Sequence, residues 1–75
     1  MTRPHQKPVQ LQLNNSGAWK NVVQFDAADQ VTSDKVVEAA VALSAIDTSA
    51  RFRIATHDAF QQVLLYVGKG EWREA

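Results

Sequence analysis

Apolar side chains recur at helical spacing in the middle of the chain, between two stretches in which apolar and polar residues alternate. Residues 31–46 carry the helical pattern, because at about 100° per residue their apolar positions fall on one arc. The pattern predicts a single helix. Its core-facing stripe is expected to consist of Val36, Ala39, Ala40, Leu43 and Ile46.

Val37 and Val41 form a second apolar stripe beside the first. One interpretation is that the helix sinks deep enough to bury both valines, and the other is that they form an exposed contact for a partner. Thr32 is the predicted N-cap, because its hydroxyl oxygen can accept a hydrogen bond from a backbone N–H of the first turn. A helix start near Asp26 or Asp29 is the alternative.

Two strands joined by a turn are predicted before the helix. Residues 9–13 alternate strictly, with their apolar set inward, and residues 14–17 favour a turn because Asn and Gly tolerate positive φ. The returning strand covers residues 19–25, and its expected inward side chains are Trp19, Val23 and Phe25, with Lys20 and Val22 outward. Asn21 then also falls on the inward side, which indicates a bulge or an uncovered end of the sheet.

Two further strands are predicted after the helix. In residues 51–56, Phe52 and Ile54 point to one side, while Arg51 and Arg53 point to the other. Residues 60–67 form the last full strand and are apolar on both sides. The glycines at 68 and 70 break this strand, so residues 71–75 are expected to be a short tail.

These elements give a ββαββ chain, which predicts an α+β fold with one helix packed on one face of a four-stranded, mainly antiparallel sheet. A right-handed crossover makes the third strand parallel to the second and leaves the strand orders 2-1-3-4 and 2-1-4-3 open. Residues 1–8 are expected to form a flexible N-terminal arm, and residues 9–75 a single domain. Leu43 and Phe52 are expected among the most buried residues.

Composition narrows the classes of protein that fit. Eight Lys and Arg residues balance eight Asp and Glu residues, so the formal net charge is zero. This argues against a protein whose main task is to hold a polyanion, although it leaves room for a local basic patch. The chain has no cysteine, which excludes a disulfide scaffold and a thiolate metal site. No signal peptide or membrane span is visible, and a cytoplasmic protein is the expectation.

Candidate catalytic chemistry is sparse. His57 and Asp58 are the only adjacent acid–base pair, and a turn explains them better than a catalytic role. His5 and His57 show no regular ligand spacing with nearby carboxylates, and no glycine-rich phosphate loop is present. We therefore expect no catalytic residues, no metal site, no cofactor and no enzymatic activity.

Two binding functions remain. The first is protein–protein interaction, with another protein or with a second copy of the chain, through an apolar strip on the sheet face opposite the helix. Its expected residues are Val22, Phe60, Leu64, Tyr66 and Trp72. The alternative is a nucleic-acid-binding sheet that stacks bases and contacts phosphates. Its expected residues are Lys20, Arg51, Arg53 and Tyr66.

The chain combines the short ββαββ layout with an Ala-rich helix, an Arg-Ile strand at Arg53-Ile54 and a late Gly-x-Trp at Gly70-Glu71-Trp72. In these features it resembles small phage or prophage accessory proteins, some of which inhibit bacterial CRISPR complexes. The resemblance covers most of the chain but assigns a role to no single residue.

Overall fold

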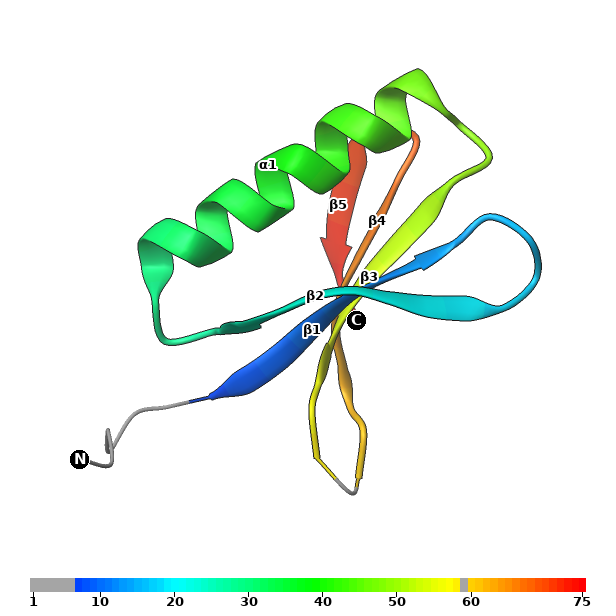
Figure 1. The fold of residues 1–75 in the computed structure, drawn as a ribbon. Coiled ribbons are helices and arrows are strands. Elements are labelled where there is room, and N and C mark those ends of the chain that lie inside the picture. Colours follow the sequence, from blue (N-terminus) through cyan, green and yellow to red (C-terminus); the bar gives the residue numbers. More distant parts are fainter. Residues whose placement is uncertain (1–6, 59) are drawn as a thin grey trace.

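The computed structural model describes residues 7–58 and 60–75 and shows one helix packed along one side of an antiparallel sheet (Figure 1). The elements in chain order are β1 (Pro8–Asn14), β2 (Trp19–Asp26), α1 (Gln30–Ile46), β3 (Arg51–Thr56), β4 (Val63–Gly68) and β5 (Glu71–Glu74). Residues 1–6 of the predicted arm lie outside the described residues. The end of that arm is structured, since Pro8 begins β1 and the Lys7 N–H donates to Asp26 Oδ1 at 2.9 Å.

The sheet has five strands in the order β2-β1-β3-β4-β5, and each pair of neighbours is antiparallel. This confirms the α+β class and the antiparallel sheet, and of the two strand orders that the sequence left open the structure has 2-1-3-4 for the first four strands. The expected four-stranded sheet is wrong in one detail, because the residues taken for a tail form β5. Lys69 and Gly70 have φ of 55° and 77°, and positive φ at both central residues suits a two-residue hairpin turn.

The buried face of α1 differs from the predicted stripe. Ala40 and Ser44 are fully buried, and Val36, Val37 and Val41 are half-buried. Leu43 and Ile46 were expected in the core, but they are 53% and 83% exposed. The physical reason is Ser44, whose hydroxyl accepts a hydrogen bond from the Gly70 N–H at 2.9 Å and donates one to the Val41 carbonyl at 3.0 Å. A satisfied hydroxyl is buried at little cost, so the helix turns this side to the sheet.

The start of α1 also lies earlier than Thr32. Asp29 is the N-cap, and its carboxylate accepts from the Thr32 N–H at 3.2 Å and from the Thr32 hydroxyl at 2.8 Å. A carboxylate caps as well as a hydroxyl and also suits the positive end of the helix dipole. The helix therefore gains the residues from Gln30 onward.

The core lies between the helix and the sheet, and strand side chains make most of it. Phe52, 4% exposed, is one of its most buried members, as predicted. The other buried apolar residues of the core cluster are Val9, Leu11, Ala40, Ala50, Ile54 and Val67.

A bulge in β2 changes the faces of its first residues. Leu11 pairs with Val23 and Gln12 with Asn21, so Val22 is the extra residue. The bulge confirms one of the two explanations expected for Asn21. It also places Trp19 on the sheet face away from α1, where Trp19 contacts Arg53, and this corrects the expected inward position of Trp19.

Candidate functional surfaces

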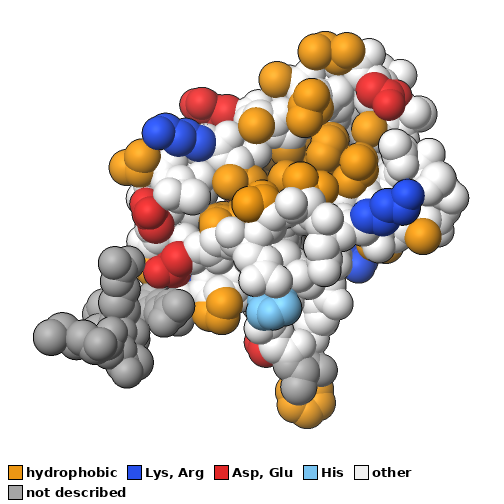
Figure 2. Space-filling model, viewed as in Figure 1, with side chains coloured by type: hydrophobic (Ala, Val, Ile, Leu, Met, Phe, Trp, Pro, Cys, Tyr) orange, Lys and Arg blue, Asp and Glu red, His pale blue; other side chains and the backbone are white. Residues whose placement is uncertain are grey.

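One margin of the core is left uncovered by the helix. Five strands span about 19 Å, whereas a helix with its side chains is only about 10–12 Å wide. Because α1 lies closest to β4 and β5, apolar side chains stay accessible between the helix and the β1–β2 hairpin, as Figure 2 shows. We call this surface the apolar margin, and its residues are Leu13, Val23, Phe25, Val36 and Leu43.

The exposure of these side chains increases from the core toward the surface. Leu13, Phe25 and Val36 are half-buried and pack against the core cluster. Val23 is 43% exposed and Leu43 is 53% exposed. The margin is thus the continuation of the core to the surface, contributed by two strands and a helix.

The opposite face of the sheet, which we call the outer face, carries arginines interleaved with aromatic rings. Gln12, Arg53, Tyr66 and Arg73 lie in one cross-strand row over β1, β3, β4 and β5. The guanidinium carbon of Arg53 lies 4.2 Å from the Trp19 ring centroid, and that of Arg73 lies 5.8 Å from the Tyr66 ring centroid. Both distances are within the range of cation–π attraction. We call Trp19, Arg51, Arg53, Tyr66 and Arg73 the arginine–aromatic cluster.

Hydrogen bonds from a buried glutamine hold the centre of this cluster. Gln12 is 6% exposed, and its Oε1 accepts from Arg53 Nε at 2.6 Å and from Gln61 Nε2 at 3.0 Å. Its Nε2 donates to Asn21 Oδ1 at 2.9 Å. The guanidinium group of Arg53 is therefore fixed by the hydrogen bond from its Nε to Gln12 and by the Trp19 ring against its planar face.

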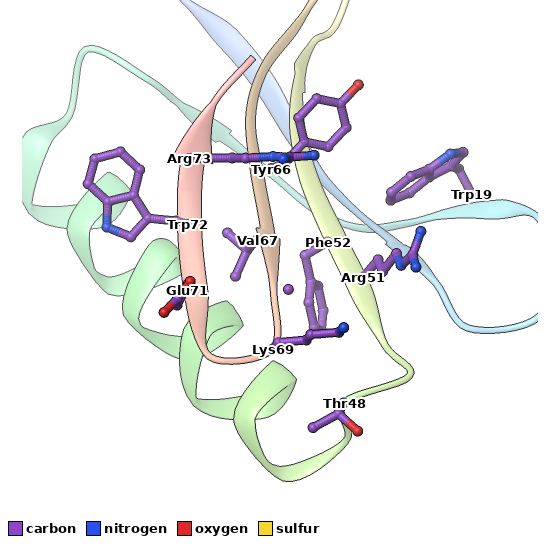
Figure 3. A pocket seen from close by; sticks show the side chains of 11 residues that line it. Trp19, Thr48, Arg51, Phe52, Tyr66, Val67, Lys69, Glu71, Trp72 and Arg73 are labelled. Carbon is purple, nitrogen blue, oxygen red and sulfur yellow. The ribbon is translucent and has the colours of Figure 1, made fainter.

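A cavity of about 460 Å³ lies beside this cluster at the end of the sheet near the β4–β5 turn, and its lining combines outer-face residues with Phe52, Val67 and Trp72 from the helix side (Figure 3). Its lining includes three cations, Arg51, Lys69 and Arg73, and one carboxylate, Glu71. Within residues 7–58 and 60–75, no carboxylate forms an ion pair with the arginines of the cluster. The cavity therefore carries an excess of positive charge that the described part of the chain does not neutralise.

The residues expected to bind nucleic acid are mostly brought together. Arg53 and Tyr66 are direct register partners on β3 and β4, and Arg51 lies on the same face of β3. Lys20 does not join them, because it is opposite Leu13 and so shares the helix side of the sheet. Trp19 and Arg73 were missed. The sequence signal that could have found Trp19 was Asn21, a polar residue on the expected inward side of its strand. No signal pointed to Arg73, because residues 71–75 were expected to be a tail.

The residues expected to bind a protein partner are spread over the molecule. Val22 is the bulge residue of β2, at one edge of the sheet, and Phe60 is 90% exposed in the loop between β3 and β4. Leu64 and Tyr66 lie on β4. Trp72 is opposite Val67 and lines a hollow between α1 and β5, so it belongs to the helix side. In Figure 3 its indole points away from Tyr66.

His57 and Asp58 lie in the loop that follows β3. Asp58 Oδ1 accepts from the Thr56 hydroxyl at 3.2 Å and from the Phe60 N–H at 3.1 Å. His57 Nδ1 lies 3.3 Å from Gln10 Oε1. His5 lies outside the described residues. In residues 7–58 and 60–75, no three His, Cys, Asp or Glu side chains gather closely enough to hold a metal ion.

Comparison of the chain with protein-family models, with curated proteins and with solved structures finds no match. In the part of the chain that the structure describes, no helix has the length and apolar character that crossing a membrane requires.

Proposed function

We propose that this protein is a non-enzymatic protein–protein interaction module that forms a homodimer through the apolar margin. The observation that carries the proposal is the exposure of Val23 and Leu43, at 43% and 53%, beside the half-buried Leu13, Phe25 and Val36. A contiguous apolar surface that continues the core is a common mark of an interface. We propose the apolar margin as the contact surface in place of the strip expected on the outer face. The residues of that strip are dispersed over the molecule: Val22, Phe60, Leu64, Tyr66 and Trp72.

A second copy of the chain is the occupant that fits best. An apolar surface is complementary to itself, so a two-fold axis through the margin would bring Leu43 of one copy against the same surface of the other. The formal net charge is zero, so two copies do not repel each other through their overall charge. Burying apolar surface contributes roughly 25 cal/mol per Å², and a margin of a few hundred Å² supports weak, reversible dimerisation.

The test is the mass in solution as a function of protein concentration. The variant combines Leu43→Gln, which keeps a good helix former, with Val23→Thr, which keeps a β-branched strand residue. We expect the parent chain to shift from monomer to dimer as its concentration rises, and to do so equally or more strongly in high salt. The variant should stay monomeric, because both exposed side chains become polar.

The matched control is Val31→Gln combined with Phe60→Gln. Both side chains are exposed and apolar, at 65% and 90%, but they lie at the start of α1 and in the β3–β4 loop. This control should dimerise like the parent. A parent chain that is monomeric at every concentration, or a control that loses the dimer as completely as the margin variant, would overturn the proposal.

A further inference from the structure

We propose that the outer face binds single-stranded nucleic acid at the arginine–aromatic cluster. Bases would stack on Tyr66 and on the outward face of the Arg53 guanidinium, and phosphates would lie against Arg51 and Arg73. The site is on the opposite side of the sheet from the apolar margin, so this inference does not rest on the proposed homodimer.

The stacking part of the inference follows from the spacing and the flatness of the cluster. Trp19 is on β2 and Tyr66 on β4, three strand spacings away, which is about 14 Å across the sheet. Between them lies the planar head of Arg53, 4.2 Å from the Trp19 ring centroid. Flat groups of this kind accept any base, because every base has a π-face.

The charge part follows from where the acidic residues lie. The formal net charge is zero, but the cavity at the cluster has three cations and one carboxylate in its lining. Asp26 ends β2 and Asp29 caps α1. Asp26 is seven residues along β2 from Trp19, a distance of about 23 Å in an extended strand and more than two Debye lengths at physiological salt. The neutral chain therefore carries a local excess of positive charge at the cavity, which is the local basic patch that the composition left room for.

The cluster is also held ready for binding. Arg53 is already fixed by Gln12 at 2.6 Å and by Trp19, so ordering this side chain costs little when a ligand arrives. The only helix among the described residues lies on the other side of the sheet, and no described helix is available on this face to enter a groove of duplex DNA. An open sheet with stacking groups suits unpaired bases, which a duplex hides.

The experiment is a fluorescence anisotropy titration of labelled oligothymidylate with the full chain at two salt concentrations. We expect binding that weakens as salt rises, since phosphate contacts release counterions. Arg51→Ala combined with Arg73→Ala should weaken binding and lower the slope of log affinity against log salt by about 1.4, at about 0.7 for each phosphate contact on a single strand. The matched control, Lys20→Ala combined with Lys35→Ala, removes the same charge from exposed sites off the outer face and should bind within twofold of the parent chain.

Stacking is tested separately at Tyr66. Tyr66→Phe keeps the ring and should bind within about twofold of the parent chain, whereas Tyr66→Leu should bind at least about fivefold more weakly, which corresponds to the loss of one base stack. Circular dichroism of each variant confirms that it is folded. The inference is wrong if the parent chain does not bind oligothymidylate at low salt, if both charge variants weaken binding equally, or if a duplex binds as tightly as the single strand. The Leu43→Gln and Val23→Thr variant should keep its affinity, which separates this site from the proposed dimer.

Discussion

Ser44 is the residue on which the contact between α1 and the β4–β5 turn depends. It is fully buried, and its hydroxyl is the acceptor for the Gly70 N–H. The turn lies so close to the helix that a Cβ at Gly70 would meet Ala45 Cβ at 3.2 Å. No water-filled gap is therefore expected to replace the hydroxyl.

We expect Ser44→Ala to lower the free energy of unfolding by about 1–3 kcal/mol, because it leaves the partly buried Gly70 N–H without its hydrogen-bond acceptor. Urea unfolding followed by circular dichroism measures the loss. Ser16→Ala, at an exposed serine in the β1–β2 turn, is the control for removing a hydroxyl and should cost less. If Ser44→Ala were as stable as the parent chain, the hydroxyl would not be what turns this side of α1 to the sheet.

At the scale of the element, α1 shows that hydrophobic periodicity predicts where a helix lies in the chain better than which side of it faces the sheet. The helix itself was predictable almost to the residue, but its orientation was wrong. The hydrophobic arc counted Leu43 and Ile46 as inward and did not include Ser44, since the pattern alone does not reveal that a serine has a partner 26 residues away. Burial of the Val37 and Val41 stripe was one of the two interpretations considered, and both side chains are half-buried against the core.

The C-terminal end of α1 makes stability depend on pH. Asp47 is the C-cap, and its Oδ1 accepts from the Ser49 hydroxyl at 2.6 Å and from the Ser49 N–H at 3.1 Å. These hydrogen bonds lower the pKa of Asp47 below its ordinary value of 3.8. The unfolded chain therefore binds the proton more readily, and the stabilisation is complete above the ordinary pKa and is lost as the pH falls through the lowered one.

We expect Ser49→Ala to be less stable than the parent chain near neutral pH, with a difference that shrinks as the pH falls well below 3.8. Urea midpoints at neutral pH and in acid measure this convergence. Thr48→Ala, at the exposed neighbouring residue, should show a difference from the parent that does not change with pH. A constant offset for Ser49→Ala as well would mean that the hydrogen bonds do not distinguish the two protonation states of Asp47.

At the scale of the whole molecule, the sequence predicted which elements exist better than which side chains meet. Alternation placed Arg51, Arg53 and Tyr66 on one face, and the strand register brings them together. It could not add Trp19 and Arg73, because one depends on a bulge and the other on a hairpin whose strand carries three charges in four residues. The apolar margin could not be predicted from the sequence either, since it depends on how much of a five-stranded sheet one helix covers.

The bulge at Val22 also protects the molecule against edge-to-edge pairing of strands from different copies. β2 is one edge of the sheet, and the bulge interrupts the row of backbone groups that a neighbouring chain would need for cross-β pairing. Deleting Val22 would leave Gln12 opposite Asn21 and Leu11 opposite Val23. The fold and the position of Trp19 on the outer face should therefore be kept. The straightened edge should then template fibril growth, which thioflavin T fluorescence would show as a rise in the Val22 deletion and not in Val22→Ala. A deletion variant that stays free of fibrils would mean that the edge is guarded by something other than its irregularity.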